Sequence, residues 1–244
     1  MRRAYDRFTI RQLQAIFAPQ VTWKAVEDVA TAKGIETSTV TLADGLKAQW
    51  IGSPAAKRVL VYLHAGGYII FPKQLEQLTV LLNHLFNTGK KPSDVAVFGA
   101  SAGAHLGLTL LSHISHPYPA IPELHLSENL AAMVLLSPMT WTNVDTPSVI
   151  KNEAKDMVPK RLLSEWTAMH GSDTGPTSHT EPAIAPAEWW KETRVDKILL
   201  LAGGDETLLD SCTEWANKFK VWRIADPYTY FFDSATIDFF FFKK

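Results

Sequence analysis

The sequence predicts an α/β fold: a mostly parallel central sheet with helices on both faces and a small helical lid. The first observation behind this is that short apolar, strand-like runs alternate along the chain with segments of helical periodicity. The second is size, because 244 residues, 46% of them hydrophobic, are enough to bury one sizeable core. We therefore expect residues 1–244 to form a single domain.

Residues 1–36 are predicted to be helical, with one helix near 10–17 and a second from 21 to about 33 that ends at Gly34. Two strands, 37–42 and 47–51, then flank Asp44 and Gly45. An Asp-Gly pair accepts the positive φ that tight hairpin turns require. This segment is therefore expected to form a β-hairpin.

Strand and helix signals then repeat in order. A strand at 58–63 runs into a loop, and leucines at helical spacing follow over 75–86 until Gly89. Further strands are expected at 94–98, 131–136 and 197–202, and further helices at 102–114 and 208–219. Residues 140–195 break this pattern with Pro-, Thr- and Trp-rich chain around one helix near 159–170, and we interpret them as the lid. Residues 221–244 form an atypical aromatic tail that fits neither period.

The segment Gly99-Ala100-Ser101-Ala102-Gly103 lies between a predicted strand and a predicted helix. Its glycines and alanines leave room for a strained strand-to-helix turn that pushes the Ser101 hydroxyl out over the sheet edge, in front of a helix N-terminus. In that context the pentapeptide predicts a nucleophile elbow, whereas polar flanks would favour an ordinary surface turn.

The segment His64-Ala65-Gly66-Gly67-Tyr68 directly follows the 58–63 strand. Backbone amides of such a glycine-containing loop can approach a substrate closely enough to stabilise the oxyanion of an acyl transfer. We predict an oxyanion hole built from the amides of Gly66, Gly67 and Ala102. His64 is assigned a supporting role rather than a catalytic one.

These two segments resemble the motifs of the hormone-sensitive-lipase-like branch of the α/β-hydrolase fold (fold-3), a family of carboxylesterases and lipases. The family carries a His-Gly-Gly-Gly loop and a Gly-Asp-Ser-Ala-Gly elbow. In this chain Ala65 replaces the first glycine of the loop, and Ala100 replaces the aspartate of the elbow. Neither replacement removes an amide donor. The likeness covers most of residues 37–219 and is greatest to fungal hydrolases of acetyl esters. It implies cofactor-free hydrolysis of a small lipophilic ester by Ser101.

The resemblance also implies an acid partner for the nucleophile. The family motif Asp/Glu-x-Leu-x-Asp is matched by Glu206, Leu208 and Asp210 after the strand at 197–202, which assigns the acid to Glu206. Its neighbour Asp205 remains the alternative. Acids at the start of a helix are also favoured by the helix dipole, which would account for the cluster without catalysis.

The family's third catalytic residue is a histidine that follows the acid. This chain has none there, because none of its eight histidines lies beyond His179. In addition, only Ile69 and Ile70 stand where the family has a further helix and strand, so about one βα unit and the C-terminal βα end are expected to be missing or replaced. The sequence therefore resembles a shortened version of a longer enzyme, and we expect it to be a poor esterase because serine needs a base beside it.

Composition excludes several other classes. The formal net charge of −1 gives no field that would attract nucleic acid, and no cluster of Cys or His suggests a metal. No run is long enough to cross a bilayer, and the arginine-bearing N-terminus lacks the apolar core of a secretory signal. We expect a cytoplasmic protein, with weak attachment to a membrane surface through the first helix as the alternative.

Two functions remain open from the sequence. The first is a serine carboxylesterase in which Trp141, Trp166, Trp189 and Trp190 of the lid line an apolar pocket, although each of them would equally suit simple packing. The second is a catalytically impaired hydrolase fold that binds a lipophilic ligand or a partner. A metalloenzyme is a weaker third idea, because the pair His113 and His116 is equally well explained by a helix end.

Overall fold

The computed structural model describes residue 12 and residues 22–42, 45–66, 71–169, 175–220 and 228–232. The expected helix near 10–17, apart from residue 12, lies outside these ranges, as do Asp44, Gly67 and His170. Contacts divide the chain into two compact units, Met1–Lys57 and Arg58–Lys244. We describe each unit by itself, and the expectation of a single domain stays a prediction.

In its described residues, the N-terminal unit contains the second of the two predicted helices and the predicted hairpin. Helix α3 (Thr22–Ala32) is followed by Gly34 at φ 64°, a left-handed conformation that suits glycine at a helix end. Strands β1 (Thr37–Thr41) and β2 (Lys47–Ile51) pair antiparallel, with Thr37 opposite Ile51 and Thr41 opposite Lys47. Gly45 in the turn has φ 81°, which explains why a glycine stands there.

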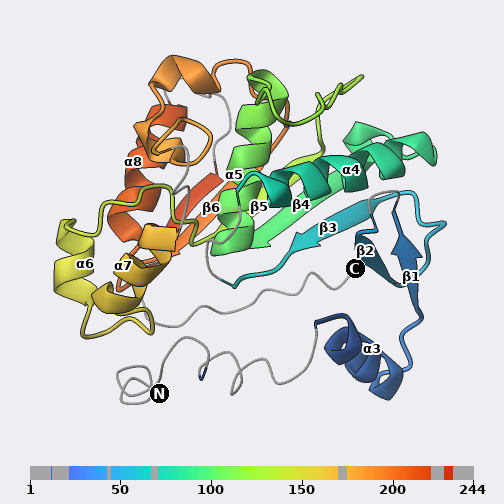
Figure 1. Ribbon diagram of the computed structural model, residues 1–244, viewed down its shortest axis with the longest axis horizontal. Helices are drawn as coiled ribbons and strands as arrows, with labels where there is room; N and C mark the ends of the chain where they lie inside the picture. The colour runs from blue at the N-terminus through green and yellow to red at the C-terminus, as the bar shows by residue number, and fades with distance from the viewer. Residues whose placement is uncertain are drawn as a thin grey trace. The chain divides into compact units, whose positions relative to one another are not determined.

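The larger unit is built on a parallel sheet in the order β3-β4-β5-β6-β7 (Figure 1). Its strands are β3 (Val59–Leu63), β4 (Val95–Ala100), β5 (Ala132–Leu136), β6 (Ile198–Gly203) and β7 (Tyr228–Phe232). Its longer helices are α4 (Lys73–Asn87), α5 (Ala102–Ser115), α7 (Lys160–Met169) and α8 (Leu209–Lys220). Each predicted strand and helix of this unit is present, with ends that differ by one or two residues.

Three features of this unit were not predicted. The 140–195 segment contains, besides α7, the short helix α6 (Pro147–Asn152) and the 3-10 turns η2 (Pro182–Ile184) and η3 (Ala187–Trp190). A further 3-10 turn, η1 (Pro92–Asp94), precedes β4. The aromatic tail, for which no strand was expected, contributes β7, which pairs parallel with β6. Aromatic residues favour strands, and the unpaired backbone groups at the edge of β6 can form hydrogen bonds with such a strand.

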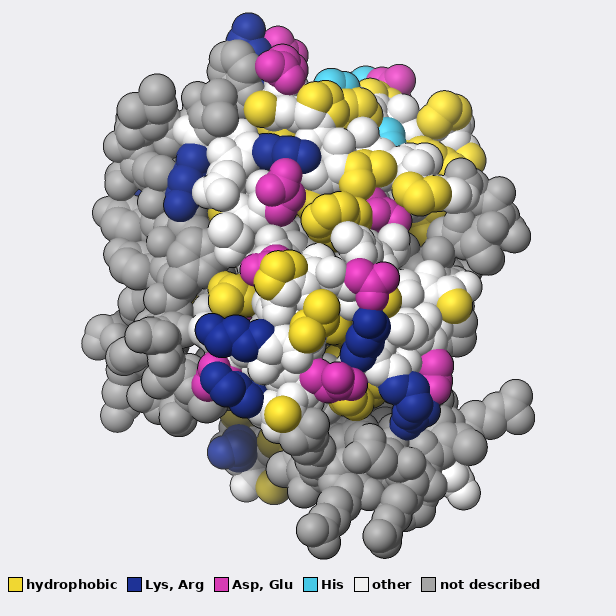
Figure 2. Space-filling model, turned by 90° about the vertical axis from the view of Figure 1, so that its left-hand side faces the viewer, with side chains coloured by type: hydrophobic (Ala, Val, Ile, Leu, Met, Phe, Trp, Pro, Cys, Tyr) yellow, Lys and Arg dark blue, Asp and Glu magenta, His cyan; other side chains and the backbone are white. Residues whose placement is uncertain are grey.

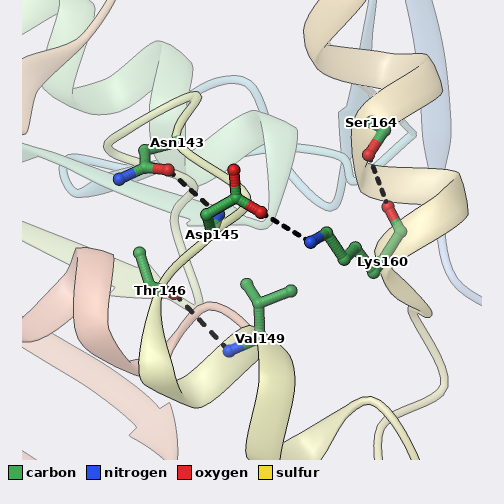
Figure 3. A network of polar contacts seen from close by, with 6 residues as sticks. All are labelled: Asn143, Asp145, Thr146, Val149, Lys160 and Ser164. Carbon is green, nitrogen blue, oxygen red and sulfur yellow. Dashed lines mark hydrogen bonds and ion pairs between the residues drawn. The ribbon is translucent and has the colours of Figure 1, made fainter.

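The α6–α7 region is held by local polar contacts (Figure 3). The hydroxyl of Thr146 accepts a hydrogen bond from the backbone N–H of Val149 and so caps the N-terminus of α6. Asp145, just before this cap, forms an ion pair with Lys160 at the start of α7, with 2.6 Å between Oδ1 and Nζ. These contacts join the two helices of the 140–195 segment.

The two faces of the sheet differ in how well they are covered. Val59, Val61, Val95, Val97, Met133, Leu135 and Leu200 lie on one face and are buried, and Gly107 of α5 packs there against Met133 and Leu135. The opposite face carries Leu60 and Tyr62 of β3, which are 62% and 61% exposed. Strand β3 ends the described sheet, as expected from the βα unit that the sequence lacks.

Helix α5 approaches the end of β3 so closely that one position tolerates only glycine. A Cβ at Gly103 would lie 2.0 Å from the carbonyl oxygen of Leu63 and 2.8 Å from that of His64. A Cβ at Gly99 would lie 2.4 Å from the carbonyl oxygen of Gly103. Both obstacles are backbone, which cannot turn aside as a side chain can. The two glycines of the elbow therefore fix the distance between β3, β4 and α5.

We predict that Gly103→Ala lowers the free energy of unfolding by about 3 kcal/mol or more, because overpacking against fixed backbone is costly. Gly107→Ala in the same helix is the matched control: its Cβ would meet a Leu135 methyl at 3.0 Å, and a gain in helix propensity offsets that contact. Urea unfolding of both variants measures the difference. Equal stabilities would contradict the close approach.

Candidate active site

Ser101 occupies the strand-to-helix turn that the sequence predicted. It follows β4 directly and precedes α5, with φ 51° and ψ −115°, a backbone conformation that residues other than glycine rarely adopt. Its N–H donates to the carbonyl of Leu136 at 2.7 Å, and its carbonyl accepts from the N–H of His105 at 2.9 Å. The residue is half-buried. Hydrogen bonds to β5 and to the next turn of α5 thus stabilise the strained backbone conformation of Ser101.

The loop after β3 begins beside this turn. Gly103 packs against the carbonyls of Leu63 and His64, so the start of the loop lies at the first turn of α5. Gly66 is exposed and has φ 152°, a conformation that favours glycine. The amide of Ala102 belongs to the first turn of α5, where N–H groups have no partner within the helix. Ala102 is the residue after Ser101, and Gly67 lies outside the described residues. The assignment of the three amides to an oxyanion hole stays a prediction.

His64 makes a contact that orders its own loop. Its Nδ1 lies 2.7 Å from the carbonyl oxygen of Ala65, and the side chain is exposed. This contact restrains the backbone just before Gly66. The supporting role suggested by the sequence stays a prediction.

Glu206 lies in the loop after β6 and is bound to the residue that follows β5. Its Oε1 accepts a hydrogen bond from the hydroxyl of Ser137 at 2.8 Å, and it also packs closely on Gly203. Ser137 has φ 49° and donates its own N–H to Leu201. Within the described part of the chain, the buried Oε2 of Glu206 has no hydrogen-bond partner. One oxygen of the carboxylate is therefore fixed and the other is left for a further contact.

The surroundings of Glu206 shift its pKa upward. Burial is the largest influence and raises the pKa of this carboxyl above its usual range. Hydrogen bonds from Ser137 and from the backbone of Gly203 lower the pKa in part, and the negative charge of Asp156 adds a smaller increase.

The two other acids near Glu206 have different partners. Asp205, in the same loop, forms an ion pair with Lys155, with 2.5 Å between Oδ1 and Nζ, and is partly exposed. Asp210, in the first turn of α8, accepts the N–H of Ser148 at 2.7 Å through its carboxylate. The hydroxyl of Ser148 accepts the N–H of Asp210 at 3.1 Å and donates to the carbonyl of Thr207 at 2.8 Å. Glu206 alone of the three contacts the residue after β5.

Ser137 was missed by the sequence reasoning. It directly follows the strand predicted at 131–136, and functional residues gather where parallel strands end, so this position was the available signal. Its contact with Glu206 joins the ends of β5 and β6 at the edge of the sheet where Ser101 follows β4.

The histidines near α5 are bound to backbone carbonyls. His105 contacts Met139 at 2.7 Å, and His116 contacts Trp189 at 2.9 Å. His179 contacts the carbonyl of His116 at 2.6 Å, and burial lowers its pKa. His113 accepts the N–H of Tyr118 on Nδ1 and contacts the carbonyl of Pro122 through Nε2, so it is neutral, and burial lowers its pKa as well. These contacts give each of the four histidines a backbone partner.

The tryptophans of the 140–195 segment also take part in packing. Trp190 is buried edge-on against Trp215, and Trp189 stacks on His116. Trp166 packs against a core cluster of Met139, Val149 and Leu163. Beside the elbow there is a cavity of about 20 Å³, lined by Phe71, Gln74, Leu75, Ala102, His105, Leu106 and Thr109. None of the four tryptophans predicted to line a pocket is among the residues that line this cavity.

A larger hollow of about 540 Å³ lies on α7 and is lined by Glu153, Lys160, Arg161, Ser164, Glu165 and Ala168. It contains none of the predicted site residues. Figure 2 shows basic and acidic side chains interspersed over one face of the molecule, with apolar side chains between them. In the described ranges there is no group of three or more His, Cys, Asp or Glu residues placed to hold a metal ion. Likewise, none of the helices described is long and apolar enough to cross a membrane.

Comparison with known proteins assigns the fold to a family. The Abhydrolase_3 family, described as alpha/beta hydrolase fold, matches residues 70–226, which include Ser101 and Glu206. The chain belongs to this family. A comparison with curated proteins gave no match.

Solved structures of esterases and lipases share the fold at low identity. An esterase from the bacterial hormone-sensitive lipase (HSL) family is 24% identical with a TM-score of 0.65, covering 81% of this chain and 73% of that one. An esterase/lipase from an uncultured bacterium is 22% identical with a TM-score of 0.63, over 85% and 78% of the two chains. A hormone-sensitive lipase from a metagenome library is 17% identical with a TM-score of 0.67, over 91% and 86%. These neighbours do not support the fungal type that the sequence suggested.

We predict that Ser101→Gly is more stable than Ser101→Ala by about 1 kcal/mol. Both variants lose the hydroxyl, but glycine relieves the strain of a positive φ, and this gain exceeds the loss from its greater freedom in the unfolded chain. Chemical unfolding of the two variants under identical conditions gives the difference. An alanine variant at least as stable as the glycine variant would show that the turn is not strained.

A second prediction concerns pH. Because the folded pKa of Glu206 is raised, the folded state holds this proton longer than the unfolded state does, so stability falls as pH rises from the unfolded value through the folded one. Glu206→Gln keeps an acceptor for Ser137 but does not ionise. Its stability relative to the unmodified chain should therefore be greater at about pH 8 than at about pH 4, by about 1.4 kcal/mol for each unit of pKa shift.

Unfolding curves at both pH values test this expectation, with Glu192→Gln as the control because Glu192 is exposed. A difference between Glu206→Gln and the unmodified chain that is the same at both pH values would refute it.

Proposed function

We propose that this chain has the active-site design of a serine hydrolase acting on carboxylic esters, with Ser101 as the nucleophile. The observation that carries the proposal is the strained turn at Ser101, packed by Gly103 against the loop after β3. A serine on a strained turn at the N-terminus of a helix suits attack on an ester carbonyl, where backbone amides of the first turn can stabilise the oxyanion. The family and its esterase neighbours support the same reaction class.

In this proposal the amides of Gly66, Gly67 and Ala102 stabilise the oxyanion. The Ser101 oxygen bonds to the ester carbonyl carbon, its proton passes to a base, and the alcohol leaves with a proton. Water then cleaves the acyl-serine bond and releases the acid. Glu206 is the acid partner, because its carboxylate is fixed at the ends of β5 and β6 while Asp205 is paired with Lys155. The near-neutral charge of the chain favours a neutral, lipophilic ester.

This proposal requires a general base for Ser101, and the sequence does not supply one at the position that the family uses. No histidine follows Glu206 in the sequence, and Ser101 is a poor nucleophile without one. Loss of one triad member lowers kcat by about 10⁴ to 10⁶, and an oxyanion hole with substrate binding retains only about 10³ to 10⁴ over water. This observation favours a second candidate function, a catalytically impaired hydrolase fold that binds lipophilic esters without turning them over.

We predict slow hydrolysis of p-nitrophenyl acetate that depends on Ser101 and that rises at least tenfold when imidazole is supplied as an external base. Imidazole also hydrolyses this ester in solution, so the rate with Ser101→Ala at the same imidazole concentration is subtracted. A fluorophosphonate label identifies the modified residue by peptide mass.

The outcomes separate the candidates. A Ser101-dependent rate that responds to imidazole supports the hydrolase. Ordinary esterase rates without imidazole would place a base where the sequence offers none. No labelling and no Ser101-dependent rate, together with retained binding of the ester, would favour the binding function.

A further inference from the structure

The loop that carries Glu206 is bound along its length by one short segment of the 140–195 region. Asn152, the last residue of α6, donates its side-chain N–H to the carbonyl of Gly204 at 3.3 Å and to that of Glu206 at 2.9 Å. Lys155 pairs with Asp205. Asp156 accepts the N–H of Thr207 at 2.6 Å through Oδ2. Each residue from 204 to 207 therefore has a partner between 152 and 156.

These contacts supply the hydrogen bonds that a strand or a helix would otherwise give the loop backbone. Strand β6 ends at Gly203 and helix α8 begins at Leu209, so the backbone between them is outside both elements. Buried backbone groups need hydrogen-bond partners, and Thr207 is only 1% exposed. The hydroxyl of Thr207 adds a second bond to Asp156 Oδ2 at 2.9 Å, while Asp156 Oδ1 accepts the N–H of Val158 at 2.9 Å.

The strongest of these contacts involve a buried amide and a charged group. Asn152 is 1% exposed, so its amide is committed to the loop carbonyls rather than to water. The bond from Thr207 N–H to Asp156 is charge-assisted and short, features of strong hydrogen bonds. The 152–156 segment is itself joined to α8, because Asp210 accepts the N–H of Ser148 in α6.

We propose that Asn152 and Asp156 are positioning residues for Glu206, so that the 140–195 region sets where the acid lies in the site. The inference rests on the proposed function only in naming Glu206 as the acid. Asp156 acts in two ways: it holds Thr207, next in sequence to Glu206, and it places a negative charge near the carboxyl. Asp205 is paired with Lys155, and Asp210 accepts a hydrogen bond from Ser148. The carboxylate whose charge raises the pKa of Glu206 is that of Asp156.

The test measures Glu206 directly and needs no catalytic activity. In protein labelled with ¹³C at the glutamate carboxyls, the Glu206 signal is identified by its loss in Glu206→Gln, and its titration is followed by NMR. Asp156→Asn should lower the midpoint, because a nearby like charge is removed. Asp145→Asn is the matched control: Asp145 is an acid of the same region, 75% exposed and paired with Lys160.

Hydrogen exchange supplies the second measurement. Asn152→Ala, which leaves the charges unchanged, should increase exchange of the amides at 205–207 at least tenfold, while amides of β4 and β5 keep their protection. A lowered midpoint in Asp156→Asn with faster loop exchange in Asn152→Ala supports the proposal. An unchanged midpoint, or unchanged loop exchange, overturns it. Ser101 labelling is scored separately, so failure of the hydrolase proposal is distinguishable from failure here.

Discussion

The close approach of α5 to the end of β3 is the constraint on which the site depends. Only the hydrogen of Gly103 separates the first turn of the helix from the carbonyls of Leu63 and His64. That contact sets the direction of α5, and with it the turn at Ser101, whose N–H is held by Leu136 of β5. A side chain at position 103 would push apart the two segments that must meet for any chemistry at Ser101. The strain at Ser101 is thus a consequence of packing that is fixed elsewhere.

The acid side of the site is organised differently, by side chains rather than by glycines. Ser137 fixes one oxygen of Glu206, and Asn152 with Asp156 fixes the backbone around it. The proposed nucleophile therefore depends on the sheet with α5, and the proposed acid depends on the residue after β5 together with the 140–195 region.

The elements predicted correctly from the sequence are those that depend on local sequence patterns. Strand and helix periodicity, and the glycines of the elbow, were sufficient to predict β3 to β6, α5 and the place of Ser101, because each depends on neighbours in sequence. Strand β7 was missed because its residues fit no regular period and are strand only by pairing with β6. Ser137, Asn152 and Asp156 were missed because their importance comes from contacts about fifty or more residues away in sequence. The choice of Glu206 over Asp205 came from a family motif, and only tertiary contacts distinguish their surroundings.

The raised pKa of Glu206 bears on what a base would change. Burial has the largest influence on this pKa and raises it, hydrogen bonds from Ser137 and Gly203 lower it in part, and the charge of Asp156 adds a smaller increase. An imidazolium beside the carboxyl would reverse this balance, because an opposite charge lowers the pKa of an acid. Ionised Glu206 would in turn stabilise the imidazolium that forms when the Ser101 proton is taken. A base beside Glu206 would therefore act in the opposite direction to burial, and each group would favour the charged form of the other.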